Sequence, residues 1–247
     1  MNKVIDKIQE SGTVTGKSGR IHKLHSPINR QEGLFVYNLI QADASVKKTL
    51  EIGCAYGLPS LHICAATNGR EDAWHTIIDP LQNTLWDGVG IQNLDAADFD
   101  AFELIENKSE FALPLLVQEE EGQFDFVFVE GSQTFDHALL DCFYATRLLR
   151  LGGYLVLDSV TRTPARCAAD FLNTLPCYEE YASVREPLPK PWPLRLLRLL
   201  REPISRLLKE EHLHSVRQQT FLKNKNTRMV AFKKIAEDER GGPAILG

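Results

Sequence analysis

The chain has 247 residues, 43% of them hydrophobic, and a formal net charge of −5 at pH 7. That hydrophobic content excludes a globally disordered chain, and the acidic balance argues against nucleic acid as the main partner. Five scattered cysteines without a Cys-x-x-Cys pair indicate neither a zinc site nor a disulfide framework. Without a signal peptide or a long apolar run, we expect a cytoplasmic protein and no membrane partner.

The chain divides into three parts. Residues 1–30 are polar and glycine-containing, which is typical of an N-terminal arm or lid. Residues 31–236 form one domain, beginning with a short amphipathic helix over 30–43. From Glu237 the chain is charged and then Gly/Pro-rich, so residues 237–247 are predicted to be a disordered tail.

Strands and helices alternate through the domain, which predicts an α/β fold with a mostly parallel sheet and helices on both faces. The predicted helices are 58–68, 88–97, 109–120, 134–150 and 163–175. The predicted strands are 48–53, 74–79, 102–106, 124–130, 153–158, 178–185 and 227–234.

An insert over residues 187–215 interrupts this alternation. Its part 187–209 begins with several prolines and continues with alternating leucine and arginine; six basic residues and one acidic residue lie between Lys190 and Lys209. Three interpretations remain open: a lid or homodimer helix with a leucine face, a solvated amphipathic helix, or a helix on a membrane surface.

The segment from Thr49 to Gly57 has the pattern of a strand, a glycine turn and a helix. Such a turn brings bare backbone against a ligand, and Asp79, about 20 residues further on, suits the hydroxyls of a ribose. No lysine or arginine lies between Glu51 and Gly69, so a phosphate is not the expected ligand. S-adenosylmethionine (SAM), which is positively charged and lacks phosphate, fits better. Alternatively, the glycines only form a tight turn and Asp79 is a solvated strand end.

At these segments the sequence resembles a known family. Residues 49–64, 75–94 and 124–160, with 26–40 before them, resemble class I SAM-dependent methyltransferases of the bacterial small-molecule O-methyltransferase type. The resemblance implies a Rossmann-like seven-stranded sheet. An NAD-dependent enzyme is disfavoured, because the third glycine of the dinucleotide motif is missing.

The resemblance also implies roles for individual residues in binding SAM. Glu51 would orient the methionine amino group directly or through water, Asp79 would accept from the ribose hydroxyls, and Ser109 would border the adenine. Glu130 is a further candidate for contact with the cofactor. The methionine and ribose parts would be lined by Gly53, Cys54, Ala55 and Gly57.

The sequence departs from the family after the fourth and fifth strands. Relatives often carry Asp-Gly-x-His and Asp-Asp or Asp-Asn there, whereas this chain has Glu130-Gly131-Ser132-Gln133 and Asp158-Ser159. Glu130 and Asp158 are candidate catalytic residues and could bind Mg²⁺, although a full set of oxygen ligands is not visible. The alternative for Glu130 is a hydrogen bond to backbone in a neighbouring loop.

His137 is the best candidate for a general base. It lies in the first turn of the helix 134–150, with Asp141 four residues later and able to orient the imidazole. An exposed helix histidine is the alternative. His22 and His25 could fold over the site with the arm, or be ordinary surface histidines. Trp86 could cover the cofactor, whereas His62 and His75 are expected to be structural.

These features predict a SAM-dependent methyltransferase that acts on a small molecule. The expected acceptor is a hydroxyl of a sugar or of a secondary metabolite, by analogy with the family. A catalytically silent SAM-binding protein, acting as a regulator or as a partner subunit, is the alternative.

Overall fold

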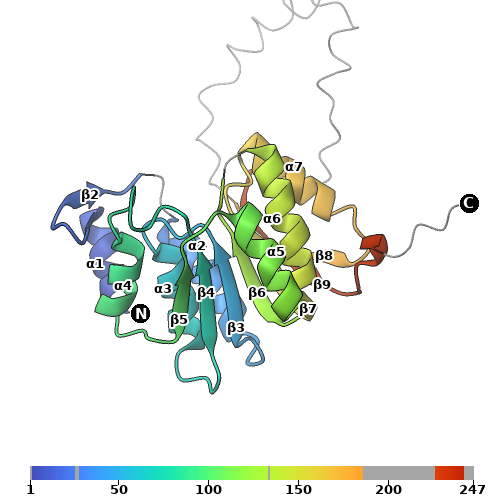
Figure 1. Ribbon diagram of the computed structural model, residues 1–247, viewed down its shortest axis with the longest axis horizontal. Helices are drawn as coiled ribbons and strands as arrows, with labels where there is room; N and C mark the ends of the chain where they lie inside the picture. The colour runs from blue at the N-terminus through green and yellow to red at the C-terminus, as the bar shows by residue number, and fades with distance from the viewer. Residues whose placement is uncertain (1, 26–27, 133, 186–225, 242–247) are drawn as a thin grey trace, which may run out of the picture.

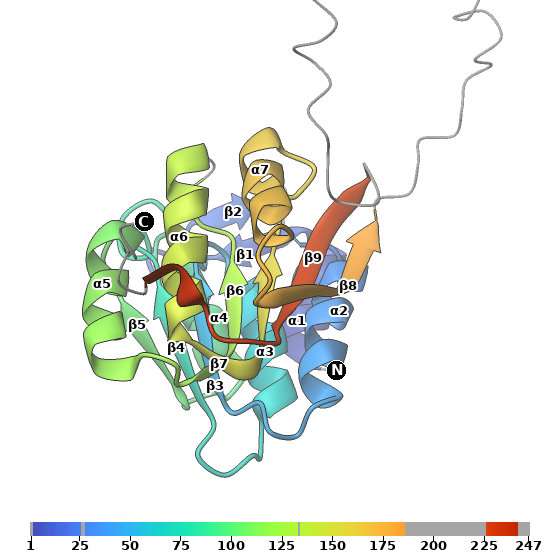
Figure 2. The same cartoon turned by 90° about the vertical axis from the view of Figure 1, so that its right-hand side faces the viewer.

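A seven-stranded sheet in the order β5-β4-β3-β6-β7-β9-β8 forms the centre of the fold in the computed structural model, which describes residues 2–25, 28–132, 134–185 and 226–241. Neighbours from β5 to β7 are parallel, whereas β9 lies antiparallel between β7 and β8, at the edge seen in Figure 2. The predicted mostly parallel α/β sheet is confirmed. Its strands are β3 (Lys48–Ile52), β4 (Trp74–Ile78), β5 (Phe102–Ile105), β6 (Phe124–Val129), β7 (Leu149–Leu157), β8 (Tyr178–Arg185) and β9 (Thr227–Lys234).

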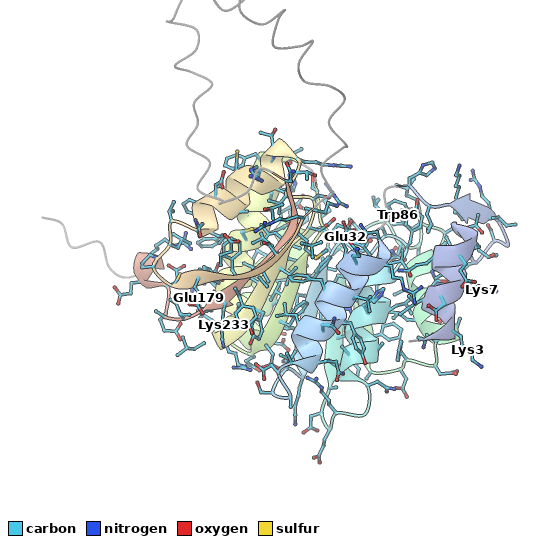
Figure 3. All side chains as sticks on the ribbon, turned by 180° about the vertical axis from the view of Figure 1, so that it is seen from behind. Lys3, Lys7, Glu32, Trp86, Glu179 and Lys233 are labelled. Atoms are coloured by element: carbon cyan, nitrogen blue, oxygen red, sulfur yellow. The ribbon has the colours of Figure 1, made fainter. Side chains whose placement is uncertain are left out.

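Helices cover both faces of this sheet, as predicted (Figures 1 and 3). One core joins Val127 and Leu155 to the helices α5 (Ser109–Glu120), α6 (Phe135–Leu148) and α7 (Thr163–Leu172). A second core contains Phe126 and Val156, the neighbours of those residues along β6 and β7, because successive strand side chains point to opposite faces. The helices of this second face are α2 (Arg30–Gln41), α3 (Leu58–Thr67) and α4 (Val89–Ala96).

The N-terminal segment, expected to be an arm or lid, has regular structure. It forms α1 (Lys3–Ser11) and a hairpin of β1 (Thr13–Thr15) with β2 (Ile21–Lys23). Ile5, Ile8 and Val14 are buried in the second core. The hairpin is held on the loop after β4, where the Asp87 carboxylate accepts hydrogen bonds from the Ser18 backbone and hydroxyl. A lid movement of this segment stays a prediction.

The two other parts of the predicted organisation lie largely outside the described residues. This is true of the insert 187–215 and of residues 242–247. The beginning of the predicted disordered tail instead forms a 3-10 helix, η2 (Glu239–Gly241), and Asp238 pairs with Arg240 there. No helix in the described part of the chain combines the length and apolar character that crossing a membrane requires.

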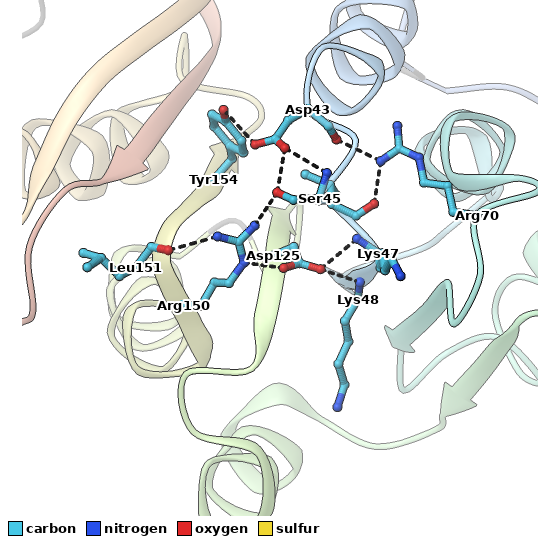
Figure 4. A network of polar contacts seen from close by, with 10 residues as sticks. Asp43, Ser45, Lys47, Lys48, Arg70, Asp125, Arg150, Leu151 and Tyr154 are labelled. Carbon is cyan, nitrogen blue, oxygen red and sulfur yellow. Dashed lines mark hydrogen bonds and ion pairs between the residues drawn. The ribbon is translucent and has the colours of Figure 1, made fainter.

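A polar network ties together the amino ends of the central strands (Figure 4). The Asp125 carboxylate at the start of β6 accepts hydrogen bonds from the backbone of Lys47 and Lys48 at the start of β3, and it pairs with Arg150 of β7. Arg70 donates to backbone carbonyls of the loop before β3. The amino ends of the central strands are therefore closed by polar contacts within the protein.

Candidate functional site

A cavity of about 530 Å³ lies at the carboxyl ends of the central strands. Ligands of open α/β sheets bind outside the carboxyl ends of the strands. The cavity is lined by residues 53–56 after β3, 79–81 after β4, 108–110 after β5, 130–132 after β6 and Ser159 after β7. Of the predicted cofactor-binding residues, the structure thus brings Gly53, Cys54, Ala55, Asp79, Ser109 and Glu130 to one cavity.

The two glycines of the turn serve contacts within the protein. Gly53 has φ +89°, and a Cβ there would lie 2.5 Å from the backbone oxygen of Glu130. Gly57 has φ +76°, and a Cβ there would lie 2.7 Å from the backbone oxygen of Gly90 in α4. Gly57 is not among the residues that line the cavity, so the structure does not place it where the resemblance implied.

Asp79 holds the backbone of the turn after β3. Its Oδ2 accepts from the Cys54 and Ala55 N–H groups at 3.0 and 2.9 Å and from Gln82 Nε2 at 3.1 Å. Its Oδ1 accepts from the Leu81 N–H at 2.8 Å. Since a carboxylate has about four acceptor positions, these bonds compete with the expected contact to ribose hydroxyls. That role stays a prediction, and shaping the turn is a second one.

Glu51 lies beneath the turn and not in the cavity lining. Its side chain is fully buried, and Oε2 accepts from Ser60 Oγ at 2.5 Å and lies 3.0 Å from His75 Nε2. The structure therefore gives no direct access from Glu51 to the cavity, and contact with an amino group through water stays a prediction. His62 and His75 are buried, as expected for structural histidines.

Cys54 does not offer a nucleophilic thiolate. Burial, together with the nearby Glu51 and Asp79 carboxylates, raises the pKa of its thiol well above the usual range, although a hydrogen bond with Ser60 opposes the shift. The thiol is therefore neutral near pH 7 and acts as a buried packing group.

The carboxyl groups of Glu130 and Asp158 meet at the ends of β6 and β7. Burial, followed by the charges of Asp158 and Glu51, raises the pKa of Glu130 well above its ordinary value, and the opposing effect of Arg228 is smaller. A raised pKa favours the neutral form of Glu130, and its role as a catalytic residue stays a prediction. As a neutral group it can donate a hydrogen bond.

Asp158 is paired inside the protein. Its Oδ2 accepts from Ser159 Oγ at 3.0 Å and lies 3.4 Å from Arg228 Nη2. Arg228 also donates through Nε to Glu32 Oε1 at 3.1 Å. Among the residues that the structure describes, no group of three His, Cys, Asp or Glu side chains could hold a metal ion. The divalent site considered for Glu130 and Asp158 therefore does not fit the residues present.

His137 lines the cavity from the first turn of α6. Its Nδ1 lies 2.8 Å from Thr134 Oγ1, and its Nε2 lies 3.8 Å from Glu110 Oε2. Thr134, and not Asp141 as expected, makes the close hydrogen bond to the ring. Asp141 is buried nearby, and this burial raises its pKa to about 6, although Ser109 and His137 oppose the shift.

Aromatic residues close one side of the cavity. Tyr56 and Trp86, both in its lining, make an edge-to-face contact with ring centroids 5.1 Å apart. The hydroxyl of Tyr56 accepts from the backbone N–H of His25, which also lines the cavity. Trp86, which is labelled in Figure 3, lines the cavity, and its expected role as a cover of the cofactor stays a prediction.

Sequence reasoning missed Arg228 and Glu32. Arg228 directly precedes the apolar segment 229–232. A positively charged side chain beside a buried strand needs a partner. Glu32 stands three residues after Asn29, the spacing of a capping box, and the structure shows that box at the start of α2. Either signal could have been found, but neither tells which residues pair across the fold.

Comparison with known proteins gives the family of the central segment. Residues 50–160 match the family profile described as "Methyltransferase domain". Over this segment, which is less than half of the 247-residue chain, the protein is similar to that family. No curated protein sequence matches the chain.

Solved structures share the fold at low sequence identity. The O-methyltransferase TomG from Streptomyces achromogenes, in complex with SAM, has TM-score 0.63 at 14% identity, covering 96% of this chain and 91% of that one. An O-methyltransferase from Bacillus cereus in complex with SAH gives 0.63 at 12%, covering 95% and 91%. Cofactor-bound Rv0187 from MTB gives 0.62 at 16%, covering 95% and 88%. The chain therefore has the fold of these proteins.

Replacing Gly53 by alanine tests the packing of the turn. Positive φ costs about 1–2 kcal/mol for a residue with a Cβ, and overlap with the Glu130 backbone adds about 1–3 kcal/mol. We expect Gly53→Ala to lower the free energy of unfolding by roughly 2–5 kcal/mol, measured by urea denaturation. Gly69→Ala is the matched control, because Gly69 has φ +78° and no atom within 4 Å of a Cβ. Equal losses in both variants would contradict the proposed contact.

Replacing Asp141 by asparagine tests its burial. The folded chain binds the Asp141 proton more tightly than the unfolded chain does, so this group lowers stability as pH rises from about 4 through about 6. At about pH 7.5 we expect Asp141→Asn to unfold with a free energy higher by about 1–3 kcal/mol, and at about pH 4 to equal the unsubstituted chain. Asp100→Asn, at an exposed carboxylate, is the control. A gain that does not depend on pH would refute the assignment.

Proposed function

We propose that this chain transfers a methyl group from SAM to a hydroxyl oxygen of a small molecule. The observation that carries the proposal is the cavity, which joins the glycine turn of the methyltransferase domain to a second group of polar side chains. Its lining includes residues 53–56 and 79–81 of the turns after β3 and β4, and the polar side chains of Glu130, His137 and Ser159. SAM and SAH in the structures of TomG and the Bacillus cereus protein support the choice of cofactor.

The residues after β3 and β4 in the cavity lining suit the adenosyl part of the cofactor. Asp79 supplies negative charge beside the turn, and its Oδ2 also accepts from Gln82, which could yield to a ribose hydroxyl. Leu81 and Ser109 line the same cavity, and an apolar side chain and a hydroxyl suit an adenine ring. When bound, SAM supplies a methyl group on a sulfonium, which is a good leaving group.

The polar side chains of Glu130, His137 and Ser159 in the lining suit an acceptor that must be oriented and deprotonated. Orientation at near-attack distance supplies much of the acceleration in such transfers. His137 can take the proton of the hydroxyl, since its side chain lines the cavity, whereas Asp158 is paired with Arg228. The contact with Thr134 holds the imidazole at Nδ1, and Nε2 is the nitrogen that can accept a proton in the tautomer in which Nδ1 donates to Thr134 Oγ1.

The narrower acceptor class is a sugar or a secondary metabolite. A cavity of about 530 Å³ must hold both the cofactor and the reacting end of the acceptor, which favours a small molecule over a protein or nucleic acid. His25, Trp86 and Arg162 border this space and would select the acceptor by shape and hydrogen bonding. The catalytically silent SAM-binding protein remains the second candidate, because the chain has Gln133 and Ser159 where relatives often carry histidine and an acidic residue or asparagine.

Binding of the cofactor is tested by isothermal titration with SAM and SAH. We expect both to bind, and Asp79→Ala to weaken SAH binding by about 1–3 kcal/mol, since the turn and the ribose lose their acceptor. Thermal unfolding followed by circular dichroism establishes that this variant is folded. Asp100→Ala, at an exposed position, should bind normally. No heat of binding for either ligand at millimolar concentration would end the proposal.

Turnover is tested by mass spectrometry of a mixture of hydroxylated sugars and aromatic metabolites incubated with SAM. We expect a methylated product, and a rate in His137→Ala that is lower by about 10²–10⁴-fold. His22→Ala is the control, because His22 pairs with Asp87 on the hairpin and does not line the cavity. A loss below tenfold would remove His137 as the base. Binding of SAM without any methylated product would support the silent protein.

A further inference from the structure

Two carboxyl groups at the ends of neighbouring parallel strands can form a site for a divalent cation. Glu130 follows β6 and Asp158 follows β7, and both line a small recess beside the main cavity. Oxygen ligands of this kind suit Mg²⁺ or Mn²⁺. Whether this carboxyl pair binds a metal ion therefore depends on the charges and the space around it.

A positively charged side chain already pairs with one of these two carboxyl groups, although it is not among the residues that line the recess. The Arg228 guanidinium is only 10% exposed, and each of its three nitrogens faces an oxygen. Nε donates to Glu32 Oε1 at 3.1 Å, Nη1 donates to Ser159 Oγ at 3.0 Å, and Nη2 lies 3.4 Å from Asp158 Oδ2. A divalent ion bound to the same Asp158 oxygen would lie against the guanidinium, and like charges repel strongly at a buried position.

The size of the recess supports the same conclusion. Its volume is about 20 Å³, which is room for about one water molecule. Mg²⁺ requires near-octahedral oxygen coordination and usually keeps several waters. Within the described ranges, no third acidic, histidine or cysteine side chain completes a metal-binding group here.

We infer that the Arg228 guanidinium takes the place of a divalent cation at the Glu130 and Asp158 carboxyl pair, so that this domain works without a metal. Arg228 is thus a positioning residue, which holds Asp158 and, through Nη1, the cavity-lining Ser159. It reaches the site from β9, whose partners β7 and β8 lie at the far edge of the sheet from β5. The inference uses the proposed function only to place the acceptor at this end of the cavity.

The test is titration with MnCl₂, followed by electron paramagnetic resonance of the free ion. We expect the unsubstituted chain to show no site tighter than ~1 mM. Arg228→Met, which keeps the length of the side chain and removes its charge, should bind Mn²⁺ at least about tenfold more tightly. Arg228→Lys retains a cation and should resemble the unsubstituted chain. The double variant Arg228→Met/Asp158→Asn should lose the gain.

Several results would overturn the inference. One is a stoichiometric Mn²⁺ site in the unsubstituted chain that Asp158→Asn abolishes. Another is an Arg228→Met variant that is folded by circular dichroism and still binds no Mn²⁺. If Arg228→Met does not fold, Asp158→Asn in the unsubstituted background decides, since unchanged Mn²⁺ binding supports the inference and weakened binding refutes it. None of these titrations needs SAM or an acceptor, so the proposed function can fail independently.

Discussion

The carboxylate of Asp79 fixes the turn on which the site depends. The turn after β3 includes Gly53 at φ +89° and Ala55 at φ +47°, and the latter is an unfavourable backbone conformation for a residue with a side chain. Two backbone N–H groups of this turn donate to one oxygen of Asp79, which stabilises the strained turn beside the parallel pairing of β3 with β4. The turn and Asp79 both line the cavity.

Much of the fold followed from the sequence because the relevant signals are local. The apolar runs of β3, β4 and β6 and the stripe of α6 specify their elements within a few residues, and the alternation of strands and helices specifies a parallel sheet. The N-terminal segment was less readable. Its helix is short and polar, and it is stabilised by Ile5 and Ile8 packing on the domain, which composition does not reveal.

The site divides in the same way between local and long-range information. Gly53, Asp79 and Glu130 could be identified because each follows a strand directly. The roles of Gly57 and Glu51 could not, because they depend on Gly90 and His75, which are distant in sequence. Arg228 is the clearest case, since its partner Glu32 lies 196 residues away. Single-sequence patterns carry no information on such pairings.

The amino ends and the carboxyl ends of the strands differ in their surroundings. The polar network around Asp125 and Arg150 closes the amino ends of the strands, whereas the cavity opens at their carboxyl ends (Figure 4). Effects of substitutions at well-separated positions are usually additive. Substitutions that stabilise the polar network at the amino ends can therefore be combined with substitutions in the cavity at the carboxyl ends, and their effects on stability are expected to add.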